Sequence, residues 1–265
     1  MKPLVIIRGG GDLASGVALR LYRVGFQVAI LELDKPLAVR RSVSFSEAVY
    51  EGAQTVEGVT ARLVSGDQFQ VTLEAGEIPI LIDPPANILK NQFLTSPAST
   101  FLVDARLLKQ APELLPGNVA LHSGLGPGFT AGADCHAVIE TQRGHTLGRV
   151  HWEGQASTDS RQPDGDPRRV LRAPSSGSLE AIKGIGDSCK EGEVIAKVNG
   201  APVISPFDGI LRGLIHPRVE ITEGMKIGDV DTRNNPSLIR LVSDKALAVA
   251  GGVLEAVFIK LKDIE

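Results

Sequence analysis

The sequence predicts an α/β protein in which a Rossmann-like parallel-sheet domain precedes a β-rich, duplicated domain of the barrel-sandwich-hybrid type and a C-terminal helix. Short apolar runs alternate with helical patterns in the first half of the chain, and two similar segments follow one another in the second half. We therefore expect the first domain over residues 1–169, the duplicated domain over 170–235, and a helix within 236–265 that packs back on the first domain.

The first thirty residues predict a strand, a tight turn, a helix and a second strand. The apolar run Leu4–Ile7 is typical of a strand that is buried in a parallel sheet. Three glycines then turn the chain, and apolar residues recur at helical spacing from Leu13 to Val24. The run Val28–Leu33 gives the next strand. This order is a βαβ unit.

Further strands are expected at 78–82, 100–103 and 118–121, with short helices around 87–93 and 105–109. The carboxyl ends of parallel strands meet at one edge of a sheet, where ligands bind in open α/β folds. Polar residues stand at these strand ends, so we expect them to cluster: Glu32, Asp83, Asp104 and His122.

The middle of the chain differs in composition from the first part. A glycine-rich loop at 123–132 precedes two short strands, around 135–141 and 146–152, which indicate a hairpin. Residues 155–169 are polar and almost free of apolar side chains, which predicts a linker or a mobile loop.

The second half repeats itself, because residues 173–198 align with 205–230 at an offset of 32 without a gap. Each copy carries P-x-x-G-x-L and then E-G-x-x-I-x-x-V, and neither copy is large enough to bury a core alone. The final helix is expected from Ser243, a plausible N-cap, to Lys262. Gly251 and Gly252 in its middle indicate a close backbone contact.

Composition excludes several classes of protein. The chain has 265 residues and a net charge of −3, which gives no electrostatic footprint for nucleic acid or an anionic membrane. Its two cysteines, Cys135 and Cys189, make neither a disulfide framework nor a zinc module, and we expect both in the core. No run approaches the roughly 20 apolar residues of a membrane span. We expect a cytoplasmic protein.

The glycine turn fits the dinucleotide fingerprint G-x-G-x-x-G/A, with Gly9, Gly11 and Ala14 at the marked positions. Glu32 stands at the end of the second strand, where a carboxylate accepts hydrogen bonds from ribose hydroxyls. Asp12 favours the helix dipole but would repel a phosphate. Gly9, Gly11, Asp12 and Glu32 are therefore predicted to bind a cofactor, and the alternative is a tight turn with no ligand.

Two further groups of residues are candidates for the site. Gly126 and Gly128 would cradle an anionic group with exposed backbone N–H groups, or else form an ordinary glycine-rich connection. Asp104, His136 and His145 are candidates for proton transfer or for holding a substrate, and the alternative for the hairpin residues is plain solvation. No ligand triad has a recognised metal spacing, so no metal site is predicted.

Several long segments resemble a known family over essentially the full length of the chain: VIIRGGGDLASGVALRLYRVGF, GLGPGFTAG and SDKALAVAGGVLEA. The chain resembles the YqeB-type accessory proteins of the selenium-dependent molybdenum hydroxylase system, and its first domain is similar to XdhC-type chaperones. The resemblance implies a maturation factor that binds a nucleotide, NAD(P) or the molybdenum cofactor. It also implies a molybdenum hydroxylase as partner and, from XdhC-like relatives, a homodimer.

Two alternative functions stay open. An NAD(P)-dependent oxidoreductase would use the same glycine turn, although the sequence has no Tyr-x-x-x-Lys signature. A non-catalytic scaffold for a hydroxylase would use the glycines only as turns. The duplicated segment also resembles biotinyl and lipoyl carrier domains, but its central turn, Val198–Ala201, has no lysine at the tip, so a covalently carried cofactor is not expected.

Overall fold

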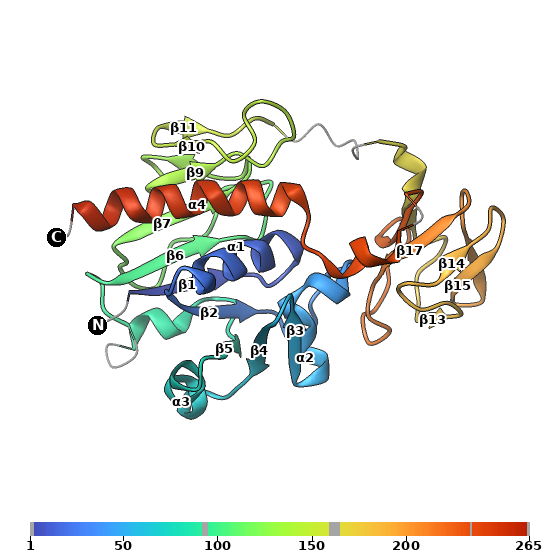
Figure 1. Ribbon diagram of the computed structural model, residues 1–265, viewed down its shortest axis with the longest axis horizontal. Helices are drawn as coiled ribbons and strands as arrows, with labels where there is room; N and C mark the ends of the chain where they lie inside the picture. Colours follow the sequence, from blue (N-terminus) through green and yellow to red (C-terminus); the bar gives the residue numbers. More distant parts are fainter. Residues whose placement is uncertain (1–2, 92–94, 159–164, 234, 264–265) are drawn as a thin grey trace.

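The computed structural model describes residues 3–91, 95–158, 165–233 and 235–263. Figure 1 shows a large sheet, two long helices that cross one of its faces, and a smaller β-rich unit to one side. The two helices are α1 (Asp12–Arg23) and α4 (Asp244–Lys262). No helix in the described ranges is long and apolar enough to cross a membrane.

The large sheet has nine strands, and seven neighbouring strands in its middle run parallel to one another. The edge strands β3 and β10 are antiparallel to their neighbours. From one edge to the other the strands are β10 (Val150–His151), β9 (Ala137–Ile139), β7 (Leu121–Leu125), β6 (Thr100–Asp104), β1 (Leu4–Arg8), β2 (Gln27–Glu32), β5 (Ile78–Ile82), β4 (Val59–Leu63) and β3 (Ala53–Val56).

The strands at the centre of this sheet are buried on both faces, which explains their continuous apolar sequences. One face packs on α1 and α4, and the other packs on α3 (Phe69–Glu74) and a single turn of 3-10 helix, η4 (Asn87–Lys90). Shorter elements connect the layers: α2 (Ala48–Glu51), β8 (Thr130–Ala131), β11 (Gly154–Gln155), η1 (Arg41–Val43), η2 (Phe45–Glu47), η3 (Gly66–Gln68), η5 (Pro167–Arg169) and η6 (Pro236–Arg240).

Helix α4 starts and packs as its sequence predicts. The Oγ of Ser243 accepts a hydrogen bond from the backbone N–H of Ala246 at 3.1 Å, which confirms the N-cap. A Cβ on Gly252 would overlap the carbonyl oxygen of Gly148, whereas one on Gly251 would stand in open space. The expected close contact therefore exists at Gly252 alone.

The smaller unit consists of two sheets whose pairing repeats with the sequence. In the three-stranded sheet Leu179 pairs with Val198, and in the four-stranded sheet Leu211 pairs with Val230, 32 residues later in each case. The first sheet holds β13 (Leu179–Ala181), β15 (Val194–Val198) and β16 (Ala201–Ile204). The second holds β12 (Val170–Arg172), β18 (Lys226–Asp231), β17 (Gly209–Leu214) and β14 (Ser188–Cys189).

This unit shares its core with the first fifty residues. Val39 and Tyr50 belong to its buried apolar cluster. The ring of Tyr50 stacks on His216 at 3.8 Å between centroids, and Nε of Arg41 donates to the carbonyl of Leu214 at 2.7 Å. The two parts are therefore joined by packing as well as by the chain.

The predicted fold class is wrong. The large sheet is mixed rather than wholly parallel, because hairpins add an antiparallel strand at each edge, and its long helices lie on one face only. The duplicated segment forms two small sheets with a core that continues into the first part of the chain, rather than a barrel-sandwich hybrid that stands apart. The hairpin of β3 and β4 turns at Glu57 and Gly58, and sequence patterning missed it.

Three predicted elements also need correction. The strand expected at 118–121 begins only at Leu121, so His122 lies inside β7 instead of beyond its end. The helix expected at 105–109 does not form, because Leu107 has a left-handed backbone with φ of 55°. The helix expected at 87–93 is one 3-10 turn, and residues 92–93 lie outside the described ranges.

Candidate functional site

A crevice of about 420 Å³ lies at the carboxyl ends of β1, β2 and β6. Strand β1 lies between β2 on one side and β6 on the other. The loops that follow β1 and β6 therefore lead away from each other and leave room for a ligand. Gly9, Gly11, Glu32 and two arginines line it. The remaining wall is largely apolar: Leu31, Leu33, Leu37, Ala38, Pro84, Ala105, Leu107 and Leu108.

Glu32 holds the glycine turn in place. Its side chain is buried, Oε2 accepts a hydrogen bond from the backbone N–H of Gly10 at 2.6 Å, and Oε1 accepts one from Leu33 at 2.8 Å. Burial raises the pKa of this carboxyl, and the two backbone hydrogen bonds oppose that rise only in part. A carboxylate oxygen has more than one acceptor position, so Glu32 can accept further donors from the crevice.

The glycines of the turn have different roles. Gly9 has φ of +90°, a conformation that favours glycine, and a Cβ on Gly10 would lie 2.9 Å from the backbone nitrogen of Ser46. Gly11 is the N-cap of α1 and lines the crevice, and a Cβ there would meet nothing within 4 Å. The turn is thus set by Gly9 and Gly10, while Gly11 leaves the helix N-terminus open towards the crevice.

Asp12 lies apart from the crevice lining. Its Oδ1 accepts from the backbone N–H of Leu13 at 3.0 Å, and its Oδ2 lies 3.5 Å from a guanidinium nitrogen of Arg40. The carboxylate therefore lies in the first turn of its own helix, where it favours the helix dipole, and pairs with an arginine. Arg40 also donates to the carbonyl of Leu241 at 3.1 Å.

Asp104 is fully buried between two arginines. Arg8, itself 1% exposed, reaches Asp104 at 3.3 Å and also donates to the carbonyl of Pro84 at 2.6 Å. Arg106 donates to both carboxylate oxygens of Asp104, at 2.8 and 2.6 Å. This carboxylate is therefore a structural counter-charge for two arginines that line the crevice.

Glu113 completes this network, and sequence patterns did not single it out. It accepts from Arg8 at 2.5 Å and from Arg106 at 2.8 Å. Burial alone would raise its pKa, but these bonds outweigh that effect and lower the pKa to about 2. Arg8 had a sequence signal, because it directly follows the apolar run of β1, whereas Glu113 comes from a loop with no motif.

Gly126 and Gly128 line neither this crevice nor the cavity described next. The N–H of Gly126 is bonded to the carbonyl of Ile139 at 3.1 Å, and a Cβ on Gly128 would overlap the carbonyl of Leu108. Both glycines allow close packing of the loop after β7.

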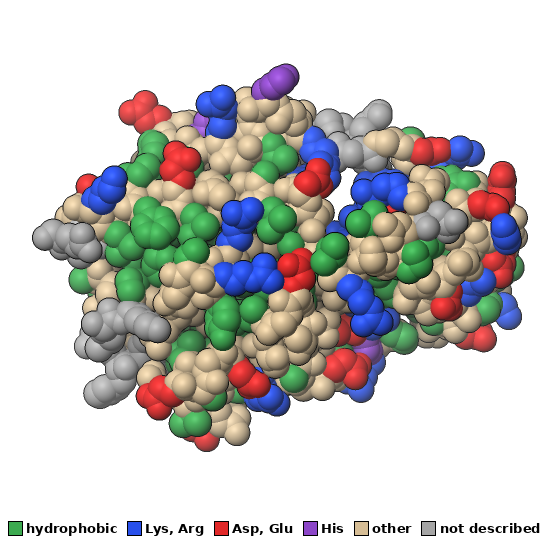
Figure 2. Space-filling view, in the orientation of Figure 1, with side chains coloured by type: hydrophobic (Ala, Val, Ile, Leu, Met, Phe, Trp, Pro, Cys, Tyr) green, Lys and Arg blue, Asp and Glu red, His purple; other side chains and the backbone are tan. Residues whose placement is uncertain are grey.

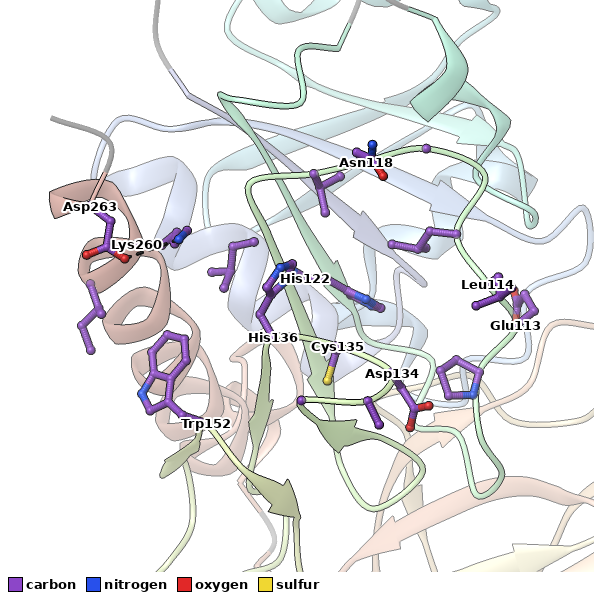
Figure 3. Close-up of a pocket in the computed structure, with 18 residues that line it drawn as sticks. Glu113, Leu114, Asn118, His122, Asp134, Cys135, His136, Trp152, Lys260 and Asp263 are labelled. Atoms are coloured by element: carbon purple, nitrogen blue, oxygen red, sulfur yellow. Dashed lines mark hydrogen bonds and ion pairs between the residues drawn. The ribbon is translucent and has the colours of Figure 1, made fainter.

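A second cavity, of about 940 Å³, lies beside the first residues of β7 and holds His136 (Figure 3). It is surrounded by residues 112–115, 117–119 and 132–136, by Trp152 and by the C-terminal end of α4. Nδ1 of His136 accepts a hydrogen bond from the backbone N–H of His122 at 2.8 Å. His145 is exposed on the loop between β9 and β10 and does not line the cavity. The structure therefore does not bring Asp104, His136 and His145 together in one site.

His122 is the residue that sequence reasoning failed to place in this cavity. It is 3% exposed, and within the described ranges no hydrogen-bond partner reaches its Nε2 atom. Burial lowers its pKa to about 4, so the ring is neutral near pH 7. Cys135 also lines the cavity, and burial raises the pKa of its thiol to about 11, so it is not an activated nucleophile.

One group of side chains in the described part of the chain has the proximity that a metal ion needs: Glu47, Glu51 and His216. Nδ1 of His216 accepts from the backbone N–H of Arg218 at 3.1 Å, which places the proton of the neutral ring on Nε2. Nε2 lies 3.5 Å from Glu51. The proton on Nε2 therefore faces a carboxylate. In this state Nε2 has no lone pair for a metal, and the lone pair of Nδ1 is already used by the N–H of Arg218.

Comparison with known proteins gives one clear sequence match. No family model matches the chain. It is 45% identical over 262 residues to the uncharacterized protein YqeB of Escherichia coli strain K12. The match covers 96% of this chain but 47% of that protein, so the chain spans about half the length of the relative.

Solved structures give only weak similarity. The ectoine utilization protein of Ruegeria pomeroyi is 13% identical with a TM-score of 0.29, over 86% of this chain and 85% of that one. An aspartoacylase family protein of Mesorhizobium loti is 8% identical with a TM-score of 0.25, over 86% of this chain and 84% of that one. A succinylglutamate desuccinylase/aspartoacylase of Rhodobacter sphaeroides is 12% identical with a TM-score of 0.26, over 88% of this chain and 87% of that one. Scores this low do not assign an activity.

Proposed function

We propose that this chain is an accessory protein in the maturation of selenium-dependent molybdenum hydroxylases, and that it binds a nucleotide or the nucleotide-like molybdenum cofactor in the crevice beside Glu32. The observation that carries the proposal is the meeting of Gly11, at the N-terminus of α1, with the Glu32 carboxylate in one crevice. The similarity to YqeB of Escherichia coli is consistent with the family resemblance from which the maturation role comes.

Different parts of the crevice suit the base, the ribose and the phosphates of a nucleotide. The leucine side chains along its wall offer an apolar surface to a flat base. Glu32 accepts hydrogen bonds from ribose hydroxyls, and the open N-terminus of α1 faces the phosphates. Arg8 and Arg106 stay with Asp104 and Glu113, so a ligand gains little extra positive charge from them. The helix N-terminus is then the main anion-binding feature.

Glu32 also sets the expected choice between NAD and NADP. Its carboxylate would repel a phosphate on the ribose 2′ position, and Arg40 is already held by Asp12 and Leu241. Ligands with a free 2′-hydroxyl should therefore bind more tightly than their 2′-phosphorylated forms.

Titration calorimetry with ADP-ribose, NAD, NADP and the molybdenum cofactor tests the crevice. We expect ADP-ribose to bind more tightly than its 2′-phosphate, and Glu32→Gln to weaken ADP-ribose by about tenfold or more, because hydrogen bonds to a charged group contribute roughly 1.5–3 kcal/mol. Glu77→Gln, which alters an ion pair with Arg62 away from the crevice, is the matched control. The absence of binding by all four ligands would remove the proposal.

The maturation role needs a test in cells. In a strain that lacks the protein, the hydroxylase should carry less molybdenum cofactor, and the wild-type chain should restore it. Glu32→Gln should still co-purify with the hydroxylase but should fail to restore its cofactor content. Full restoration by this variant would instead favour a scaffold that uses the glycine turn only structurally.

A further inference from the structure

A third cavity, of about 470 Å³, lies between the large sheet with its helices and the smaller β-rich unit. Figure 2 shows Lys and Arg side chains gathered beside the hollow that separates these two parts of the molecule. Residues from the loop between β9 and β10, from the start of α4 and from β17 and β18 line the cavity. Its arginines come from four separate segments of the chain: Arg143, Arg169, Arg212 and Arg233. Among the described residues, it shares no lining residue with the crevice or with the cavity that holds His136.

The carboxylates at this cavity are already paired. Four aspartates either line it or pair with an arginine that lines it, and each has an arginine nitrogen within 2.7 Å: Asp166 with Arg168, Asp229 with Arg169, Asp231 with Arg233, and Asp244 with Arg143. Arg212 is the fifth arginine of this group, so five guanidinium groups stand against four carboxylates. Arg40, a further cation near Arg212, has its own partner in Asp12. The group therefore carries a surplus positive charge at Arg212.

Arg212 also has hydrogen-bond donors that the protein does not use. Its side chain is 16% exposed, and its nitrogens lie 3.8 Å from Asp229 and 3.7 Å from Asp231, beyond hydrogen-bonding distance. Nε is enclosed without a partner, whereas no hydrogen bond from the described residues occupies Nη1 or Nη2, which stay accessible on a side chain that lines the cavity. Burial and then the nearby Arg40 lower the pKa of Arg212, which is the effect of a positive charge that its surroundings compensate incompletely.

We propose that this cavity binds an oxyanion, the phosphate or the carboxylate group of a small molecule, through Nη1 and Nη2 of Arg212. The two terminal nitrogens of a guanidinium donate parallel hydrogen bonds whose spacing matches two oxygens of either group. The anion replaces water at these nitrogens and compensates the surplus charge, whereas a cation would meet four arginines. The volume of the cavity lies in the range of small-ligand sites. The inference does not depend on a nucleotide in the crevice.

Titrations with inorganic phosphate and with acetate, followed by the NMR signals of the backbone amides, test this site. Sodium chloride keeps the ionic strength constant and serves as the reference anion. We expect saturable shifts at residues 212 and 230–233, and Arg212→Gln should weaken the bound anion by about tenfold or more, because it removes charged hydrogen bonds. Arg62→Gln, which breaks an exposed ion pair with Glu77 away from the cavity, is the matched control and should leave the affinity unchanged. Tighter binding of phosphate would identify a phosphorylated ligand, and tighter binding of acetate an organic acid.

Three outcomes would overturn the proposal. These are the absence of saturable shifts with both anions, shifts confined to residues 9–12 beside the crevice, and an unchanged affinity in Arg212→Gln. The comparison with chloride in the wild-type protein keeps the test decisive if Arg212→Gln does not fold. Shifts confined to residues 9–12 would agree with the proposed function while contradicting this site, and failure of ADP-ribose to bind in the crevice would count against the proposed function only.

Discussion

The crevice beside Glu32 and the cavity beside His122 satisfy their polar groups in different ways. In the crevice the side chains of Arg8, Asp104, Arg106 and Glu32 form a network of hydrogen bonds within the protein, although Nε of Arg8 has no partner among the described residues. In the cavity the Nε2 atom of His122 has none in the described ranges. The crevice is therefore held in shape by a network of charged hydrogen bonds, whereas no hydrogen bond from the described residues reaches Nε2 of His122 beside the cavity. Shape alone does not separate the two sites, because both are open hollows on the surface.

Removing Asp104 from the hydrogen-bond network of the crevice should have the largest effect on stability. Asp104→Ala removes the buried partner of Arg8 and leaves that guanidinium, 1% exposed, with less compensation. Urea unfolding should show a loss of about 3–5 kcal/mol, the usual effect of breaking a buried ion pair. Asp166→Ala, which breaks the exposed pair with Arg168, should have little effect. Equal, small losses in both variants would contradict the structural role of Asp104.

His122, which lines the cavity, should make the stability of the protein depend on pH. The folded state keeps His122 neutral down to about pH 4, whereas the unfolded chain protonates it near its ordinary pKa of 6.5. Stability should therefore fall as the pH decreases from 6.5 to 4, with a contribution from His122 of about 3 kcal/mol. Urea unfolding of wild type and His122→Asn at several pH values isolates this contribution. Parallel pH profiles would show that His122 is not held neutral.

Helix α4, whose C-terminal end lines the cavity, packs closely on the backbone of Gly148 at Gly252. Substitutions at Gly251 and Gly252 test this contact, with a smaller expected effect on stability. Gly252→Ala should destabilise the protein by about 1–3 kcal/mol, because the new methyl group would overlap the carbonyl of Gly148. Gly251→Ala meets nothing within 4 Å and should stabilise the helix by up to about 1 kcal/mol. Thermal unfolding of both variants measures the difference, and shifts of the same sign would argue against this packing of α4.

The crevice was predictable because its residues follow local patterns. Gly9, Gly11 and Glu32 belong to one strand–turn–helix–strand unit of about thirty residues, whose hydrophobic spacing is clear in the sequence. Glu113 escaped prediction because its role depends on contact with Arg8, which lies 105 residues away in the chain. Motifs thus located the glycine turn but not the network that surrounds it.

The position of His122 and one edge of the sheet were not predictable for a related reason, whereas the hairpin of β9 and β10 at the other edge was expected at 135–141 and 146–152 and is confirmed. His122 was expected just after a strand, but β7 starts at Leu121, and this shift places His122 within the strand. The edge strand β3 is joined to β4 by a turn with no strong signal, and its antiparallel pairing is one of the two that make the sheet mixed. Strand register and edge pairing depend on contacts across the fold, which apolar periodicity does not specify.

A crystal structure of the protein with ADP-ribose would show directly whether the crevice beside Glu32 binds a nucleotide. We expect ribose hydroxyls within hydrogen-bonding distance of the Glu32 carboxylate and phosphate oxygens at the N-terminus of α1 beside Gly11. Ligand density at another surface, or a crevice that stays empty at saturating ADP-ribose, would contradict nucleotide binding at this site.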